Sequence, residues 1–312
     1  MAAYNKAVRG PKGRKILERN TRSVFHRIHL AQANDPAVFN RLIDMLNTDY
    51  LGLKKDFFKG KVCLDAGCGS NLNATLALLR MGAKKVYAFD LDRSILKKVP
   101  DALKAYRGRY DIGTGNVLNI KFKDAIFDFT HCSGVLHHTA NAALGLKELV
   151  RVTKPGGLVY VVIHGRGGII REIVNLLRDK YAADKTFKKL IDDLDEDWFA
   201  ALWDWLLASM RENGDTAGAR ILPPATIKEL FDKDLVLTIK DRITAPVYNE
   251  YTEQQVRVVL KKCGIVNIRR VTRYPRLKNI RRFLCPFYYE YDSPFSRMLF
   301  GEGCIQLIGT KR

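Results

Sequence analysis

Apolar residues occur along the chain in two patterns, short continuous runs and longer stretches with helical spacing. The runs are of strand length and lie at residues 62–64, 85–90, 127–132, 158–163, 265–271 and 304–309. Helical spacing separates most of them, for example at residues 142–153. Strands that alternate with helices predict an α/β fold in which a mostly parallel sheet is covered by helices on both faces.

A mostly helical stretch interrupts the alternation and divides the chain into predicted parts. Residues 1–58 form a basic, helical N-terminal extension. Residues 168–240, which hold all three tryptophans, form a helical cap over a pocket mouth, and the tryptophans either line that pocket or pack within the cap. The core comprises residues 59–167 and 241–312, with a basic and aromatic insertion at 273–301.

The charge of the chain is unbalanced and lies mainly at its two ends. The 312 residues include 53 Lys and Arg against 33 Asp and Glu, a formal net charge of +20. Residues 1–28 and 266–312 each carry a net +7, which leaves +6 for the residues between them. Such ends are typical either of a solvated surface or of a footprint for an anionic partner, such as RNA or a membrane surface.

The same sequence disfavours several classes of protein. No run approaches 18 apolar residues, so no transmembrane segment is expected. The six cysteines form no CxxC pair and no zinc-finger spacing, which predicts reduced thiols, a cytoplasmic location and no metal site. A hydrophobic content of 47% is that of a globular protein rather than a disordered one.

A glycine-rich turn follows the first predicted strand and carries the most specific chemistry in the sequence. It reads D-A-G-C-G from Asp65 to Gly69, and its glycines allow the backbone to pass close to a ligand. A dinucleotide fingerprint needs glycine at position 72, where Leu72 stands, and a phosphate-binding loop needs a Gly-Lys-Ser/Thr sequence, which is absent. The carboxylate of Asp65 instead suits a cationic group of a ligand.

Further motifs follow this turn in order. They are Asp90 after the second strand, G-N-V at 115–117, S-G-V-L-H-H at 133–138 and K-P-G-G at 154–157. With these motifs, residues 60–165 resemble the class I S-adenosylmethionine-dependent methyltransferases. The resemblance implies a doubly wound, mostly parallel seven-stranded sheet of the Rossmann-like methyltransferase fold, S-adenosylmethionine as cofactor, and methyl transfer as the reaction.

The resemblance also implies roles for individual residues. Asp65 and the glycines after it are expected to line the methionine portion of the cofactor, and Asp90 to accept hydrogen bonds from both ribose hydroxyls. Asn116 can accept from the adenine amine, and Asn71 replaces a glycine of many members at a point where asparagine tolerates a left-handed backbone. The residues expected to contact the cofactor are Asp65, Ala66, Gly67, Cys68, Gly69, Asp90, Leu91, Asn116, Val117, Ser133, Gly134 and His138.

The catalytic candidates are side chains able to accept a proton near the ends of the later strands. In-line methyl transfer depends mainly on alignment of the reacting atoms, and a general base is needed when the acceptor must lose a proton early. The candidates are His164 after the fifth strand, His137 in the S-G-V-L-H-H motif and Tyr248 before the helix predicted at residues 252–262. That helix is expected to begin with a capping box formed by Thr252 and Gln255. Because the motif occurs in this family whatever the acceptor, His137 and His138 are expected to pack or to contact the cofactor more often than to act as bases.

The predicted function is methyl transfer to O or N of a small-molecule or lipid-like acceptor, which the basic ends lead us to expect to be anionic. The alternative is an RNA methyltransferase that binds tRNA or rRNA through those ends. Against it, residues 133–136 lack the Asn-Pro-Pro-Tyr type of tetrapeptide that base amino-group methylases commonly carry. A third interpretation is a non-catalytic cofactor-binding subunit or membrane-surface adaptor.

Overall fold

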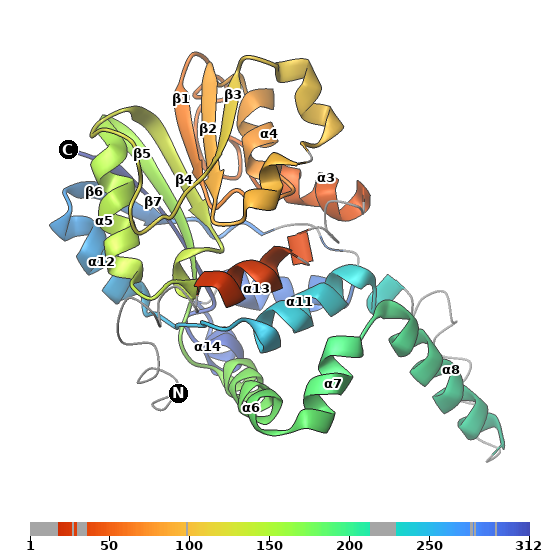
Figure 1. Cartoon of the computed structure of the whole chain (residues 1–312). Coiled ribbons are helices and arrows are strands. Elements are labelled where there is room, and N and C mark those ends of the chain that lie inside the picture. Colours follow the sequence, from red (N-terminus) through yellow and green to blue (C-terminus); the bar gives the residue numbers. More distant parts are fainter. Residues whose placement is uncertain are drawn as a thin grey trace.

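The centre of the molecule is a twisted sheet (Figure 1). The computed structural model describes residues 18–26, 28–29, 36–97, 99–212, 229–274, 277, 279–290 and 292–312. Within these residues, seven strands form one sheet in the order β3-β2-β1-β4-β5-β7-β6. The strands are β1 (Val62–Ala66), β2 (Lys85–Asp90), β3 (Tyr110–Thr114), β4 (Phe127–Ser133), β5 (Thr153–His164), β6 (Ile265–Arg270) and β7 (Cys304–Lys311).

The strands are parallel except for β7, which is antiparallel to both of its neighbours, β5 and β6. This confirms the predicted doubly wound, mostly parallel seven-stranded sheet. Because β1, β2, β3, β4 and β5 run in the same direction, their carboxyl ends meet at one edge of the sheet. That edge is where ligands bind in open α/β sheets.

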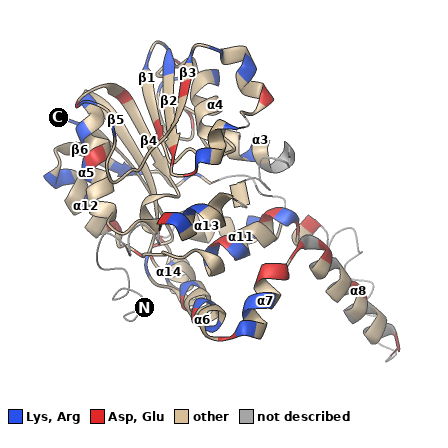
Figure 2. Ribbon diagram, viewed as in Figure 1, with Lys and Arg blue, Asp and Glu red and all other residues tan. Residues whose placement is uncertain are grey.

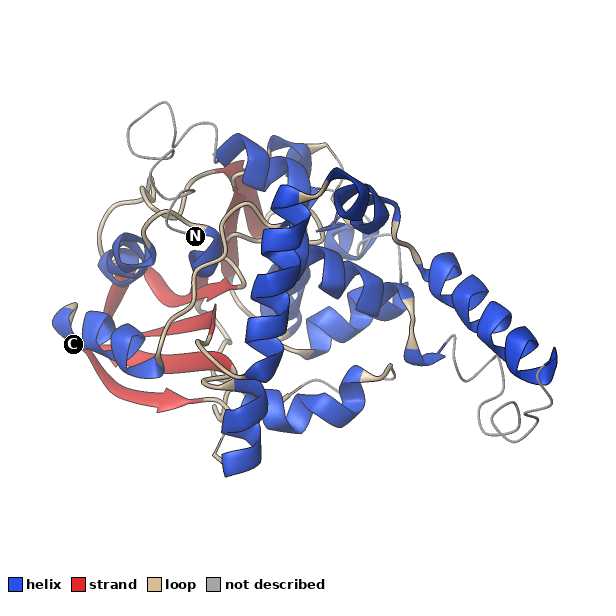
Figure 3. Ribbon diagram, turned by 90° about the horizontal axis from the view of Figure 1, so that it is seen from below, coloured by secondary structure: helices blue, strands red, loops and turns tan. Residues whose placement is uncertain are grey.

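Successive residues of the central strands point to opposite faces, and helices cover both faces. Cys63 and Tyr160 belong to an apolar cluster that includes residues of α3 (Pro36–Asp44) and α4 (Asn73–Arg80). Leu64 and Val161, one position further along, belong to a second cluster with α5 (Ala142–Val152) and α12 (Glu253–Lys262). Figure 3 shows helices on both sides of the strands. The alternation of buried side chains therefore sets the layered fold.

The stretch between β2 and β3 differs from the helix expected there. It contains two short 3₁₀ helices, Arg93–Leu96 and Asp101–Tyr106, and then the strand β3, which the hydrophobic pattern did not indicate. β3 forms one edge of the sheet, and none of its five residues is fully buried. An edge strand with a half-exposed surface needs few apolar residues, so its sequence carries little strand signal.

The helices outside the core gather beyond the carboxyl edge of the sheet (Figure 1). They are α6 (Ile169–Ala183), α7 (Lys185–Asp193), α8 (Glu196–Glu212), α11 (Lys233–Thr244), α13 (Arg281–Glu290) and α14 (Pro294–Phe300). α6 packs against α11 and α14, whereas α8 projects away from the body (Figures 1 and 3). The expected boundary between cap and core at residue 240 falls inside α11, a single helix. The side chains of Trp198 and Trp205 on α8 are exposed.

The start of α12 agrees with the sequence. The Thr252 hydroxyl accepts a hydrogen bond from the backbone N–H of Gln255, and the Gln255 side chain accepts one from the Thr252 N–H. This reciprocal capping box satisfies two backbone donors that the first helical turn leaves open. Asn34 and Asp35, which precede Pro36 at the start of α3, lie outside the described residues.

Basic residues are spread over the helices beyond the sheet (Figure 2), and several of the C-terminal part form ion pairs with other parts of the chain. Arg270 forms an ion pair with Glu253 at 2.7 Å, and its own side chain is buried. Arg273 pairs with Asp49 and Arg281 with Asp234. Residues 1–17, which carry most of the N-terminal excess charge, lie outside the described residues. Among the helices that the structure describes, none is long and apolar enough to span a membrane.

Candidate active site

One cavity of about 370 Å³ lies at the carboxyl edge of the sheet and contains most of the residues singled out from the sequence. Its floor comes from the ends of β1, β2, β4 and β5 and from the turns that follow them. Its remaining walls come from the N-terminal helical segment (residues 18–26 and 28–29), from α3, and from α11 and α13 beyond the sheet. Three parts of the chain that are distant in sequence therefore enclose the same space.

The glycine-rich turn after β1 takes a shape that side chains at its glycines would prevent. Gly67 has φ +79°, and a Cβ atom there would lie 2.2 Å from Val135 Cγ2. The backbone N–H groups of Gly67 and Cys68 both donate to the Phe89 carbonyl, at 2.8 and 3.1 Å, which ties the turn to the end of β2. The left-handed residue expected at Asn71 is instead Leu72, at φ 50°. Its fully buried side chain helps to hold that conformation.

Asp65 ends in a buried hydrogen-bond network. One carboxylate oxygen accepts from the His131 ring at 2.9 Å, and the other accepts from the Thr75 hydroxyl at 2.7 Å. The side chain is only 1% exposed but lines the cavity. A carboxylate has about four acceptor positions, so two remain for a ligand cation. No sequence motif indicates the contact of His131 with Asp65.

Asp90, at the end of β2, is held by two backbone N–H groups. Its Oδ2 accepts from Gly69 at 3.0 Å and its Oδ1 accepts from Asp92 at 2.9 Å. Asp92 itself lines the cavity, and its Oδ2 accepts from the His26 ring at 2.8 Å. The shape of the glycine turn and the position of the Asp90 carboxylate are therefore coupled.

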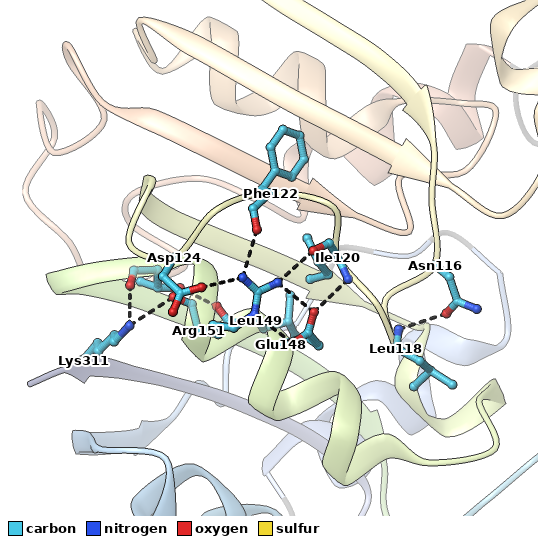
Figure 4. A network of polar contacts seen from close by, with 10 residues as sticks. Asn116, Leu118, Ile120, Phe122, Asp124, Glu148, Leu149, Arg151 and Lys311 are labelled. Atoms are coloured by element: carbon cyan, nitrogen blue, oxygen red, sulfur yellow. Dashed lines mark hydrogen bonds and ion pairs between the residues drawn. The ribbon is translucent and has the colours of Figure 1, made fainter.

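Asn116 is fixed from two sides. Its Oδ1 accepts from the Leu118 N–H at 2.9 Å, and its Nδ2 donates to Glu18 Oε1 of the N-terminal helical segment at 2.8 Å. Further along the same loop, the Arg151 guanidinium donates to the carbonyls of Ile120 and Phe122 (Figure 4). This network anchors the loop that carries Asn116 and Val117 to α5.

Three histidines, at 137, 138 and 164, line the other end of the cavity. The rings of His137 and His164 stack with centroids 3.9 Å apart, and those of His137 and His138 are 4.1 Å apart. Burial lowers the pKa of His137 and His164 well below the usual value, and neighbouring positive groups lower it further. Burial also lowers the pKa of His138, so all three rings are neutral at pH 7.

Tyr248 lies behind the histidines rather than on the cavity wall. Its ring centroid is 5.1 Å from that of His164, and its hydroxyl accepts a hydrogen bond from Arg171. Burial raises the pKa of Tyr248, and the nearby Arg242 and Arg171 act in the opposite direction. A neutral tyrosine that is hydrogen-bonded behind the histidines can position them.

The structure brings nearly all the predicted cofactor residues to one place. Leu91, Val117, Ser133 and Gly134 line the cavity together with the glycine turn, Asp90, Asn116 and His138. Ala66 is the exception among them, since its side chain is buried in the apolar cluster with α5. Trp198 and Trp205, the tryptophans of α8 whose side chains the structure describes, do not line the cavity.

Several cavity residues were not anticipated. On the N-terminal helical segment, Glu18, Phe25 and His29 face the cavity, and the Phe25 ring lies 4.6 Å from that of His138. Their spacing is helical, which is the one signal that could have grouped them. Thr238 and Asp241 reach the cavity from α11, also one turn apart, but no motif marks them.

Comparisons with known proteins agree with this arrangement. A family model described as a methyltransferase domain matches residues 64–161. Demethylmenaquinone methyltransferase of Geobacillus stearothermophilus is 32% identical over 143 residues, which cover 42% of this chain and 60% of that protein. Ribosomal protein L11 methyltransferase of Legionella pneumophila is 31% identical over 147 residues, which cover 47% and 46%. The chain thus spans less than two thirds of the length of these relatives.

A solved structure is similar over more of the chain. The 1,6-didemethyltoxoflavin-N1-methyltransferase of Burkholderia thailandensis, with bound 1,6-didemethyltoxoflavin and S-adenosylhomocysteine, has a TM-score of 0.48 and 15% identity, covering 97% of this chain and 90% of that one. The family match falls on the strands and turns that carry the glycine turn, Asp90 and the S-G-V-L-H-H motif. Residues 64–161 therefore form a class I S-adenosylmethionine-dependent methyltransferase domain.

Proposed function

We propose that the protein transfers a methyl group from S-adenosylmethionine to O or N of a small-molecule or lipid-like acceptor. The observation that carries this proposal is the continuity of the cavity. The glycine turn, Asp90 and Asn116 share one enclosed space with His137, His138 and His164. A cofactor end and an acceptor end that meet inside the same cavity are what a direct transfer between two bound molecules requires.

In this proposal the chain's residues bind and orient the cofactor by charge and shape. S-adenosylmethionine, when bound, supplies an electrophilic methyl group on a positively charged sulfur. Asp65 faces its ammonium group, Asp90 its ribose hydroxyls, and Asn116 its adenine. The turn fits such a ligand because Gly67 adopts a backbone that a side chain would block, and because both carboxylates keep unfilled acceptor positions.

The acceptor end offers neutral side chains that can position the nucleophile. His137 and His164 are the candidates for accepting its proton, because burial keeps both rings unprotonated. Tyr248 fixes the rings from behind. Ser133 and Gly134, at the end of β4, line the cavity, and in this proposal they lie beside the methyl group. In-line alignment of nucleophile, methyl and sulfur accounts for most of the acceleration expected of such a site.

The cavity limits what the acceptor can be. The cavity of about 370 Å³ is shared with the cofactor, so only its histidine end is left for the acceptor, which suits a small molecule or the reactive end of a larger one. The relatives are named for acceptors as different as demethylmenaquinone and ribosomal protein L11, so their names do not define the acceptor. The class of acceptor is therefore inferred from the size and the lining residues of the cavity. The anionic character expected from the basic ends is assigned here to a part of the acceptor that stays outside the cavity. The RNA alternative is weakened, because Arg270 and Arg281 form ion pairs within the protein.

The test uses methyl-labelled S-adenosylmethionine and a fractionated cell extract. We expect the full-length protein to bind the cofactor in calorimetry and to move the label into the small-molecule or lipid fraction. No cofactor binding at high micromolar concentration would overturn the proposal. Label found in RNA would instead establish the alternative, and that RNA binding should weaken steeply with salt.

A further inference from the structure

The acceptor end of the cavity contains a pair of hydrogen-bond acceptors that converge from two distant elements. His138 follows β4, and Asp241 lies on α11, the helix that crosses the carboxyl edge of the sheet (Figure 1). Both residues line the cavity, and His138 Nε2 is 3.9 Å from Asp241 Oδ1. The pair is separate from the glycine turn, while the rings of His137 and Tyr248 pack against that of His138, at 4.1 and 5.6 Å between centroids.

The hydrogen bonding of His138 defines which of its ring nitrogens accepts. Nδ1 lies 2.7 Å from the Val247 carbonyl oxygen, which can only accept, so the proton is on Nδ1. Burial keeps the ring neutral. Nε2 therefore presents a lone pair toward Asp241.

The second acceptor is Asp241 Oδ1. This atom is buried and has no hydrogen-bond partner within the described residues. Thr238, one turn earlier on α11, donates its hydroxyl proton to the Asp234 carbonyl at 2.8 Å and so does not supply the missing donor. A buried carboxylate oxygen without a donor costs free energy, and a ligand that supplies one recovers it.

The charge of the cavity restricts the ligand further. Among the described residues that line it, five carry carboxylates and one, Arg22, carries a permanent positive charge. Arg171 and Arg178 do not reach the cavity surface. Arg171 donates to Tyr248, and Arg178 donates to backbone carbonyls of residues 242, 243 and 245. Arg242, next to Asp241 on α11, acts through its charge on Asp241, His137 and His164, but it does not line the cavity either. An anionic reacting group would therefore meet the Asp241 carboxylate with no Arg171, Arg178 or Arg242 side chain at the cavity surface to bind it.

From these contacts we propose that His138 and Asp241 form the binding site for the acceptor's reacting group, and that this group is a primary amine. The inference rests on the proposed function and deepens it. A primary amine has two N–H bonds and one lone pair. One N–H donates to His138 Nε2 and the other to Asp241 Oδ1, and two acceptors 3.9 Å apart can both be reached from one nitrogen. The lone pair is then held pointing away from both acceptors.

The transfer step balances with these two residues. The amine lone pair forms the new N–C bond, the C–S bond breaks, and its electron pair stays on sulfur as S-adenosylhomocysteine leaves. The nitrogen becomes a methylated ammonium whose two N–H groups stay hydrogen-bonded to His138 Nε2 and Asp241 Oδ1. It keeps both protons in the site, because burial lowers the pKa of His138, and it leaves as the ammonium product. His138 and Asp241 thus bind and orient the reacting nitrogen.

The test compares three probes that share a ring and differ in one group, namely benzylamine, benzyl alcohol and benzoate. Their binding to the full-length protein saturated with S-adenosylhomocysteine is measured by titration calorimetry and ligand-observed NMR. We expect benzylamine to bind about tenfold or more tightly than benzoate, as hydrogen bonds to a charged partner predict. Asp241→Asn and His138→Asn should each remove most of this preference, and Asp241→Asn should leave the affinity for S-adenosylhomocysteine unchanged.

Asp179→Asn is the matched control, because it removes the same charge from an exposed position on α6 and should change nothing. The ranking of the three probes by affinity is measured on the unmodified protein, so it does not depend on whether any variant folds. Equal binding of the three, or tightest binding of benzoate, with S-adenosylhomocysteine bound normally, would overturn the inference alone. Failure of S-adenosylhomocysteine itself to bind would overturn the proposed function and this inference with it.

Discussion

Single residues at the cofactor end of the cavity fix the backbone around the site as well as lining the space for the ligand. Asp90 accepts from the N–H groups of Gly69 and Asp92, so its carboxylate holds the turn that it serves. Gly67 permits the close approach of Val135 across the turn. Asp65 is set in place by His131 and Thr75, which no motif indicated. Residue types in this region were predictable, whereas their partners were not.

Replacing Gly67 tests the shape of the turn. Gly67→Ala should lower stability by more than the roughly 1 kcal/mol expected for a left-handed alanine, because its Cβ would also lie 2.2 Å from Val135. It should also abolish binding of S-adenosylhomocysteine. Gly108→Ala is the control, since Gly108 has φ +80° and no atom within 4 Å of an added Cβ. Thermal melts and calorimetry measure both effects, and equal results for the two variants would contradict this explanation.

Replacing Asp90 tests the ribose contact. Asp90→Ala should weaken S-adenosylmethionine binding about tenfold or more, because two charge-assisted hydrogen bonds to the ligand and the bond to Gly69 are lost. Asp111→Ala removes a carboxylate from the neighbouring edge strand, where the side chain is 60% exposed, and should leave binding intact. Unchanged affinity in the Asp90 variant would show that the ribose is held elsewhere.

At the scale of elements, local periodicity predicted most strands and helices but not which elements pack against one another. Runs of apolar residues marked β1, β2, β4, β5, β6 and β7, and the capping box marked the start of α12. The edge strand β3 was missed because half of its surface faces solvent. The N-terminal helical segment was expected as an extension, but its packing across the cavity depends on contacts with the core, such as that of Glu18 with Asn116.

The N-terminal helical segment should contribute directly to ligand retention. Phe25→Ala removes the ring that lies 4.6 Å from His138 and should increase the dissociation rate of S-adenosylhomocysteine several-fold, because that wall of the cavity opens. Asn20→Ala, at an exposed position of the same segment, is the control. Stopped-flow fluorescence measures the rates. Identical rates for both variants would mean that the segment does not restrict exit.

At the scale of the whole molecule, the charge on the surface and the charge in the cavity have opposite signs. The chain carries +20, yet carboxylates outnumber permanent cations among the described residues of the cavity wall. Several basic side chains that suggested an anionic partner are instead bonded within the fold. Net charge therefore describes what surrounds the protein, and the cavity lining describes what enters it.

The buried histidines should make stability depend on pH. Burial lowers the pKa of His29, His137, His138 and His164 in the folded state. Above about pH 6.5 both states are neutral at these positions, but below it the unfolded chain takes up protons that the folded chain does not. The free energy of unfolding should thus fall below about pH 6.5, by at most about 1.4 kcal/mol per pH unit for each histidine.

Urea unfolding at a series of pH values between about 7.5 and 5.5 measures this dependence. The double variant His137→Asn/His164→Asn should flatten the plot of unfolding free energy against pH. It lacks two of the side chains that take up a proton in the unfolded chain but not in the folded one. A curve that stays level from neutral pH to about 5.5 in the unmodified protein would contradict the burial of neutral histidines.

The order of motifs along the chain was sufficient to identify the sheet, the glycine turn and the cofactor class. These features depend on short-range sterics, strand-length apolar runs and carboxylates at strand ends, all of which neighbouring residues specify. The arrangement of the acceptor end of the cavity could not be predicted from local sequence in the same way. His138 and Asp241 meet only because α11 buries its apolar side against the helices beyond the sheet, where α6 packs on it. The pairing of distant side chains follows from the burial of apolar faces, which no local pattern records.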